Sequence, residues 1–251
     1  MDIHIDIEHP PIFQIPGVPD HVTYTWIVMG ILLTVSLLAS RSRELVPRGL
    51  QNLMEAVFEQ FQTLLDEVVG LEGRRFFPLI ATLGLFILTS NLLGLVPGLM
   101  APTQNINTTA ACALIVFVTY HWIGIREKGL KEYAKHFMGP VPALAPLMVI
   151  VEIFSHLARP LSLALRLFGN MTGGHILLVV IFGLTLGISQ MIFDGSLPGL
   201  LIGLPGGGIL IVFTTGFLIP LKILVSFLQA FIFIMLSMLY IGGAIEEAEH
   251  H

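Results

Sequence analysis

Charged side chains are scarce in this chain. Asp, Glu, Lys and Arg make up only 12% of its 251 residues, where a soluble domain would carry roughly a quarter. Hydrophobic residues account for 55%, and the mean hydropathy is +0.86. Too little polar surface remains to coat a water-soluble globule of 27.5 kDa. The composition excludes soluble enzymes, nucleic-acid-binding proteins and disordered chains, and it indicates a membrane protein.

Other common signals are also missing. The only cysteine, Cys112, lies in an apolar run and cannot form an internal disulfide. The sequence contains no GxSxG motif, no P-loop and no paired cysteines, so nothing points to a self-contained enzyme. Residues 1–23 carry acids where a signal peptide would carry Lys or Arg. We therefore expect this segment to stay on the mature protein as an irregular external segment.

Long apolar stretches predict helices that cross the bilayer, which takes about 20 residues each. Three charge-free stretches have this length, at 24–40, 77–99 and 107–125. Two further stretches, at 141–191 and 208–245, would form helices of roughly 75 and 55 Å at 1.5 Å per residue. Because these helices exceed the thickness of the bilayer, we expect them to be strongly tilted, bent or broken. Pro160 and the Gly173–Gly174 pair are the expected places for bending.

The basic residues predict the orientation. Of the 12 Lys and Arg, five follow the first span, four follow the third, and three lie within the long apolar stretches. None lies in residues 1–23. By the positive-inside rule the N-terminus is external, and five crossings leave a cytoplasmic tail at 246–251. The fold class predicted is an all-α membrane protein whose residues 24–251 form a single membrane domain.

The connection at 49–70 has the pattern of an amphipathic helix. Its apolar residues recur at helical spacing and would form one face, namely Leu50, Leu53, Met54, Val57, Phe58, Phe61, Leu64, Leu65 and Val68. We expect this helix to lie along the cytoplasmic membrane surface. Its acidic polar face leaves open a second interpretation, a small helix packed on another loop of the protein.

Ionisable residues inside membrane segments are costly, so they are candidates for function. Arg166 has apolar neighbours and no carboxylate within one helical turn. Glu152 precedes it by 14 residues, about 21 Å of helix toward the cytoplasm, and His175 follows by 9, about 13.5 Å toward the exterior. Asn170 lies one turn beyond Arg166 on the same face, whereas Arg159 can reach the cytoplasmic interface.

A second polar stripe lies in the last apolar stretch. Lys222, Ser226 and Gln229 are spaced four and three residues apart, which puts them on one helix face. Two long helices with polar stripes are expected to face each other or a common partner. Because His and a buried Glu can change protonation whereas Arg cannot, these stripes favour a path for protons.

Two other functions fit parts of the pattern. Glu152 and His156 could start a metal site, but no third ligand is near in sequence. An intramembrane metalloenzyme of this kind would contain bound metal when purified. A proton-coupled carrier would transport a solute when reconstituted alone, but no internal repeat is visible, and many carriers are built from repeated halves.

Three segments carry a specific resemblance. They read SNLLGLVPG at 90–98, RPLSLALRLFGNMTGGH at 159–175 and SFLQAFIFIMLSMLYI at 226–241. In motif and order they resemble subunit a of the bacterial F-type ATP synthase. The resemblance implies a non-catalytic stator subunit in the bacterial inner membrane, without cofactor or metal. It would contact a ring of c subunits, peripheral-stalk b subunits, lipid and the rest of the complex, with protons passing through two offset half-channels.

The resemblance also implies residue roles. Arg166 matches the essential arginine of the family, Asn170 its nearby polar residue and Gln229 the glutamine opposite it. Glu152 and Ser155 match positions of the cytoplasmic half-channel, and His175 matches a Glu or His of the external one. Lys222 departs from the family, which usually has His or an acid there.

Overall fold

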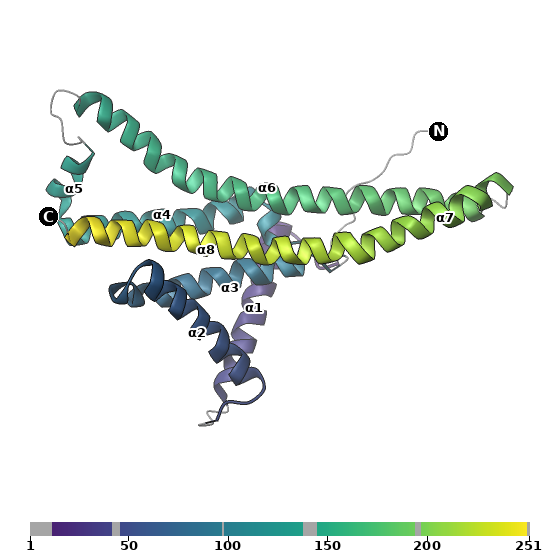
Figure 1. The fold of residues 1–251 in the computed structure, drawn as a ribbon, viewed down its shortest axis with the longest axis horizontal. Coiled ribbons are helices and arrows are strands. Elements are labelled where there is room, and N and C mark those ends of the chain that lie inside the picture. The colour runs from purple at the N-terminus through teal and green to yellow at the C-terminus, as the bar shows by residue number, and fades with distance from the viewer. Residues whose placement is uncertain (1–11, 42–45, 97, 138–144, 194–196, 250–251) are drawn as a thin grey trace.

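The computed structural model describes residues 12–41, 46–96, 98–137, 145–193 and 197–249, and every regular element in these ranges is a helix. In chain order they are α1 (Asp20–Arg41), α2 (Leu50–Val68), the 3-10 helix η1 (Leu71–Phe76), α3 (Phe77–Leu93), the 3-10 turn η2 (Pro102–Gln104), α4 (Ile106–Lys128), α5 (Leu130–His136), α6 (Ala145–Phe193), α7 (Leu197–Phe213) and α8 (Ile219–Glu249), with a π-helical turn at Thr214–Leu218 (Figure 1). Within the described residues, five helical segments are long and apolar enough to cross a membrane. The predicted fold class, an all-α membrane protein, is confirmed.

Two helix boundaries differ clearly from the sequence-based ones. The second span was expected to run over 77–99, but its helix ends at Leu93. Gly94 follows, and the sequence has a proline at 97, which disfavours helix at the residue before it. Gly98 then has a φ of +84°, in the left-handed region that favours glycine.

The last apolar helix begins well before the expected 208. It starts at Leu197 and passes through Pro205 and the glycines after it, which sequence propensity assigns to a loop. Packing explains the difference, because Gly206 and Gly207 lie against the side chain of Ile188 on α6. The helix also continues to Glu249, into the predicted tail. α6 runs over Ala145–Phe193, past the expected end at 191, and the expected first residues, 141–144, lie outside the described residues.

The long helix α6 is bent but unbroken. It spans 49 residues and continues through Pro160 and both central glycines. Its N-terminal third points away from α8, and the remainder runs alongside α7 and α8 (Figure 1). Proline leaves the carbonyl of His156 without its helical donor, and the Tyr120 hydroxyl of α4 lies 3.5 Å from that oxygen. The hydroxyl has one hydrogen, which this carbonyl shares with Nδ1 of His156 at 3.1 Å, so a neighbouring helix only partly replaces the donor that the proline removes.

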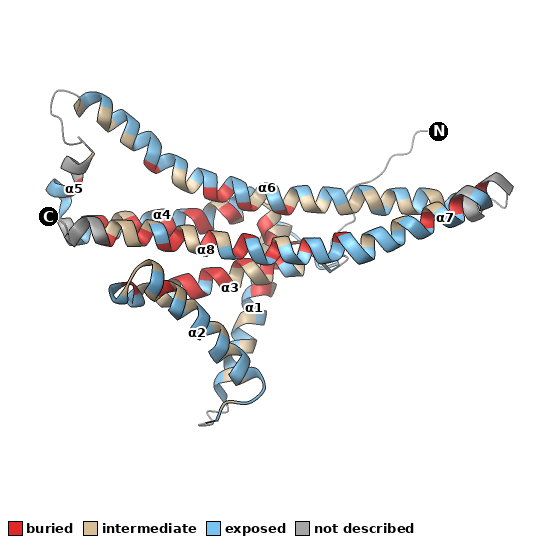
Figure 2. Ribbon diagram, in the orientation of Figure 1, coloured by how far each residue is buried: buried red, intermediate tan, exposed pale blue. Residues whose placement is uncertain are grey.

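The core lies where α3, α4, α6 and α8 meet. Leu167, Ile87 and Phe233 are fully buried there, and the distal part of the α6–α7 hairpin is exposed (Figure 2). Even large apolar residues of α6 are exposed; Leu161, for example, is 60% exposed. Apolar exposure on this scale requires cover by lipid or by other subunits.

The amphipathic helix α2 packs its apolar face against the bundle. Leu65 is fully buried against a cluster that includes Ile80 and Ile241 of α3 and α8, and Phe58 makes an edge-to-face contact with Phe77. The helix therefore contacts other membrane helices through the face that its sequence pattern predicts.

Candidate functional site

The two polar stripes of α6 and α8 meet in the middle of the bundle. The amide Nδ2 of Asn170 donates to Oε1 of Gln229 at 2.6 Å. Gln229 is buried, and its own Nε2 has no hydrogen-bond partner among the described residues. One polar contact therefore joins the two long helices, and it leaves a donor available beside it.

Arg166 lies one turn before Asn170 and is exposed on α6. Leu165, which precedes it in the chain, is also exposed. In the part of the chain that the structure describes, no carboxylate lies within ion-pair distance of the guanidinium. A cation on an apolar membrane-facing surface is costly, so its counter-charge is expected from outside this chain.

Toward the N-terminal end of α6, Glu152 and His156 form a close pair. Nε2 of His156 lies 3.2 Å from Oε1 of Glu152, and Nδ1 lies 3.1 Å from the Tyr120 hydroxyl. Ser155 is exposed beside them. The guanidinium of Arg159, which was expected to reach the interface, lies over the rings of Tyr120 and Tyr240, 5.9 and 5.5 Å from their centroids.

Toward the other end of α6, Lys222 approaches the turn that carries His175. Its Nζ donates to the carbonyl of Gly94 at 3.4 Å, and a β-carbon on Gly174 would lie 3.7 Å from its Cε. Lys222 is therefore held between the C-terminal end of α3 and α6. Three acids that the sequence offers as possible partners of Lys222, namely Asp194, Asp6 and Glu8, lie outside the described residues.

Sequence reasoning missed the polar contribution of α3. Asn91 accepts a hydrogen bond from Thr103 at 2.7 Å and donates to the carbonyl of Ser226 at 3.3 Å. The hydroxyls of Ser90 and Ser226 are buried without a partner in the described ranges. Buried polar groups of this kind are what ordered water binds. The signal was present in the polar pair within SNLLGL, but spacing along one helix does not indicate which other helix it faces.

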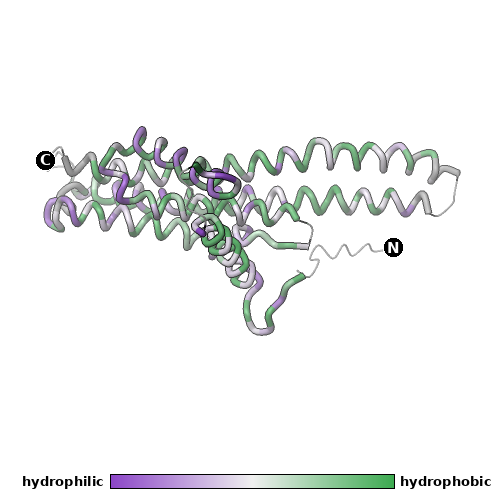
Figure 3. The backbone as a smooth tube through the Cα atoms, turned by 90° about the horizontal axis from the view of Figure 1, so that it is seen from below, coloured by the Kyte–Doolittle hydropathy of each residue, from purple (hydrophilic) through white to green (hydrophobic). Residues whose placement is uncertain are grey.

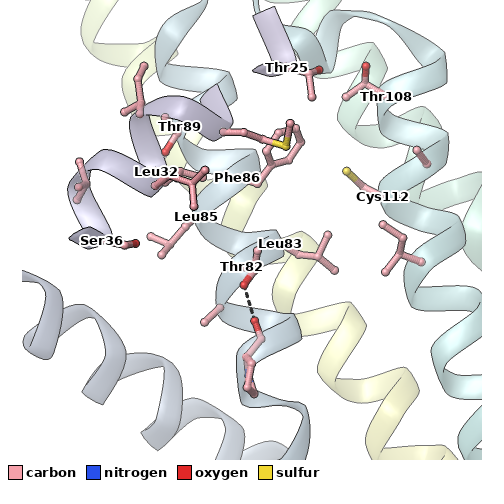
Figure 4. Close-up of a pocket in the computed structure, with 18 of the residues that line it drawn as sticks. Thr25, Leu32, Ser36, Thr82, Leu83, Leu85, Phe86, Thr89, Thr108 and Cys112 are labelled. Atoms are coloured by element: carbon pink, nitrogen blue, oxygen red, sulfur yellow. Dashed lines mark hydrogen bonds between the residues drawn. The ribbon is translucent and has the colours of Figure 1, made fainter. Parts of the chain in front are cut away.

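A cavity of about 1020 Å³ lies elsewhere, between α1, α3 and α4 (Figure 4). Leu32, Leu85, Phe86 and Cys112 line it, with a few threonine hydroxyls. Its lining is mainly apolar, and it lies away from the stripes of α6 and α8. It offers no arrangement of titratable groups for proton chemistry.

Metal binding receives no support from the described residues, in which no three His, Cys, Asp or Glu side chains come together. Glu152 and His156 supply two potential ligands, and a stable transition-metal site needs at least a third. The arrangement along α6 and α8 is instead a series of polar and titratable groups on both sides of Arg166.

Comparison with known proteins covers almost the whole chain. The family model described as ATP synthase A chain matches residues 22–242. ATP synthase subunit a 1 of Pelobacter propionicus is 47% identical over 229 residues, which cover 91% of this chain and 89% of that protein. ATP synthase subunit a of Geobacter sulfurreducens shows the same identity and coverage. ATP synthase subunit a of Citrifermentans bemidjiense is 45% identical over 243 residues, with 97% and 94% covered. The matched range includes every residue of both polar stripes.

Proposed function

The chain belongs to the ATP synthase subunit a family, and on that basis we propose that it is the stator subunit whose two half-channels couple proton flow to rotation of a c-subunit ring. The observation that carries this proposal is the position of Arg166. It is a permanent cation, exposed on a helix of mainly apolar residues, with no counter-ion in the described part of its own chain. A ring of carboxylate-bearing subunits supplies the missing counter-charge.

Arg166 acts on the ring carboxylate through its charge. A carboxylate that is protonated while it faces lipid loses its proton when it meets the guanidinium, because a nearby cation favours the ionised form. The same fixed charge repels protons and prevents a continuous proton path through the protein. Net transfer therefore requires rotation of the ring. The proton-motive force supplies about 2.3 kcal/mol per charge per 100 mV.

The groups on each side of Arg166 form the two half-channels. Glu152 and Ser155 belong to the cytoplasmic half-channel, and Asn170, His175, Lys222 and Gln229 line the path from the external side. The buried polar groups of α3 support the external path, because Ser90 and Asn91 add water-binding atoms beside α8. This chain carries out no bond chemistry, and ATP is formed on other subunits.

The charge distribution supports the orientation. Hydrophilic residues gather at the end of the bundle that carries α5 and the C-terminus, and the far end of the α6–α7 hairpin is mostly apolar (Figure 3). By the positive-inside rule, the basic residues near that hydrophilic end support a cytoplasmic location for it and an external N-terminus. The exposed apolar faces of α6 and α8 are the expected contact with the ring, while the peripheral-stalk b subunits and lipid cover other faces.

Replacing Arg166 tests the proposal. Arg166→Ala should abolish proton-driven ATP synthesis in membrane vesicles and leave assembly of the complex intact, because the exposed side chain contributes little to packing within the chain. Arg166→Lys should also fail, since an ammonium lacks the planar, permanently charged guanidinium.

Arg126→Ala is the matched control, because Arg126 lies over the Trp122 ring at the end of α4, outside both polar stripes. It should synthesise ATP as the unmodified protein does. Synthesis at the unmodified rate by a fully assembled Arg166→Ala complex would refute the proposal.

A further inference from the structure

His156 connects Glu152 to a neighbouring helix. His156 is only 8% exposed, although the preceding residue, Ser155, is exposed. The ring is stacked between aromatic side chains, with its centroid 4.9 Å from that of Phe137 and 5.8 Å from that of Tyr120. Its orientation is therefore fixed by packing as well as by hydrogen bonds.

The two ring nitrogens have different partners. An ionised Glu152 can only accept, so Nε2 of His156 carries the hydrogen that it donates across 3.2 Å. Nδ1 is then the acceptor for the Tyr120 hydroxyl at 3.1 Å. A single neutral tautomer satisfies both contacts, and no net charge is added to the interior.

Tyr120 is itself held in place. Its hydroxyl lies against the His156 carbonyl that Pro160 leaves without a helical donor, and the Arg159 guanidinium lies over its ring. His121 packs beside the same rings, with its Nδ1 on the carbonyl of Phe117. The cluster thus anchors the hydrogen-bond chain Tyr120–His156–Glu152 to α4.

We propose that His156 is a positioning residue for proton release, which holds the Glu152 carboxylate in the orientation that faces the cytoplasmic half-channel. This inference rests on the proposed role of Glu152. Without the imidazole donor, Glu152 would rotate freely on the bent, poorly packed third of α6. His156 acts through Glu152 and does not itself contact the ring carboxylate.

Two substitutions separate positioning from structural anchoring. In His156→Gln the amide nitrogen occupies the place of Nε2, so the bond to Glu152 is kept and that to Tyr120 is lost. In His156→Asn the amide occupies the place of Nδ1, so the bond to Tyr120 is kept and that to Glu152 is lost. ATP-driven proton pumping in inverted vesicles, normalised to assembled complex, should be about tenfold lower for His156→Asn, because hydrogen bonds to charged groups are the stronger ones. His156→Gln should restore most of the rate.

Glu152→Gln provides the second arm of the test. If His156 acts through Glu152, His156→Asn should cause little further loss in a Glu152→Gln background. His121→Gln is the matched control, because His121 packs in the same cluster and bonds a backbone carbonyl. It should pump at nearly the unmodified rate.

Three outcomes would overturn the inference: the reverse order of Asn and Gln, an undiminished effect of His156→Asn in the Glu152→Gln background, or full activity of Glu152→Gln alone. None of these would overturn the proposed function as long as Arg166→Ala complexes fail to pump. Pumping by Arg166→Ala would overturn the proposed function whatever the result at His156.

Discussion

Lys222 shows how a cation is accommodated inside the membrane domain. The side chain is only 8% exposed, and its ammonium donates to Gly94, at the C-terminal end of α3. The carbonyls at a helix C-terminus carry partial negative charge and lack helical donors, so they favour a cation there. A neutral amide donor can bond the same carbonyl. The contact therefore gives Lys222 a structural role that does not require its charge.

His175 and Lys222 should consequently differ in their effect on proton flow. Lys222→Gln should retain substantial pumping, because a glutamine amide can still donate to the Gly94 carbonyl. His175→Leu should reduce pumping by at least about tenfold, since a neutral imidazole can accept a proton at one nitrogen and donate at the other, and leucine can do neither. The measurement is ATP-driven proton uptake by inverted vesicles.

Lys222→Leu is the companion variant. It removes both charge and donor and leaves the Gly94 carbonyl without Lys222 as its donor, so it should lower the amount of assembled complex more than Lys222→Gln does. If Lys222→Gln stops pumping while His175→Leu does not, Lys222 is the residue that transfers protons and His175 has the structural role.

At the residue scale, the sequence predicts which polar residues share a helix face better than it predicts which residues they contact on other helices. The spacing of Lys222, Ser226 and Gln229 indicates one helix face, and helical geometry alone places Asn170 one turn from Arg166. The contact between Asn170 and Gln229 is consistent with two stripes that face each other. The contribution of Asn91 could not be predicted, because pairing with a helix far along the chain depends on tertiary packing.

The bend of α6 lies beside a hydrogen-bond donor of another helix. Pro160 frees the carbonyl of His156, and the Tyr120 hydroxyl lies 3.5 Å from it. The same hydroxyl lies closer, at 3.1 Å, to Nδ1 of His156. Its single hydrogen is therefore shared between the freed carbonyl and the imidazole, with the imidazole as the nearer acceptor.

Tyr120→Phe should destabilise the assembled complex by about 1–3 kcal/mol, the cost of leaving buried polar groups unsatisfied. In a Pro160→Ala background the loss should be smaller, because the residue at 160 then supplies its own N–H to the His156 carbonyl. Thermal unfolding of the purified complex measures both. An equal loss in the two backgrounds would show that the tyrosine hydroxyl does not compensate for the proline.

The end of α2 is fixed to η1 by an ion pair. Arg74 donates two hydrogen bonds to the Asp66 carboxylate, at 2.8 and 2.6 Å. The hydrogen bonds from Arg74 hold the pKa of Asp66 below its ordinary value of 3.8. Because the folded-state pKa is lowered, the pair stabilises the fold above the ordinary pKa, and this contribution disappears as the pH falls through the lowered one.

Asp66→Asn should therefore lower the unfolding temperature slightly at neutral pH, and the difference from the unmodified protein should begin to shrink at about pH 4 and vanish once the pH is below the lowered pKa of Asp66. High salt should also shrink the difference, since the pair is solvent-exposed. Glu67→Gln, an exposed neighbour on α2, is the control and should change the unfolding temperature less at neutral pH. A constant difference across the whole pH range would contradict the ionic origin of the effect.

At the element scale, periodicity predicts the type of every long helix but not all of its ends. The apolar face of α2 is evident from spacing, and its packing against α3 and α8 agrees with it. The start of α7 could not be predicted, because glycine and proline are poor helix formers and only contact with α6 makes that segment helical. Local propensity failed at the point where a neighbouring helix supplies the stability.

The whole chain is not a self-sufficient fold. Much of α6 and α7 is exposed and apolar, and α6 contributes few buried residues outside the stretch from Leu163 to Met171 that packs in the core (Figure 2). Such a surface is stable only against lipid or partner subunits. This exposure agrees with the proposed contact with a ring, since Arg166 lies on the exposed side of α6.

Access to the two ends of α6 tests the two-half-channel arrangement most directly. Cysteines are introduced singly at Ser155 and Gly174 in a Cys112→Ala background, so that only the new thiol can react. Position 174 has room for a β-carbon, and Ser155 is already exposed. A cysteine at Gly183, farther along α6 with open space around it, is the control and should resist a membrane-impermeant thiol reagent because it faces apolar surroundings.

The assembled complex is labelled with that reagent in vesicles of both orientations. The account predicts that the cysteine at 155 reacts preferentially from the cytoplasmic face and the cysteine at 174 from the external face, each through water that reaches only one side of Arg166. Equal labelling of both positions from one face would contradict it, because a single continuous path would then connect the two ends without passing the ring.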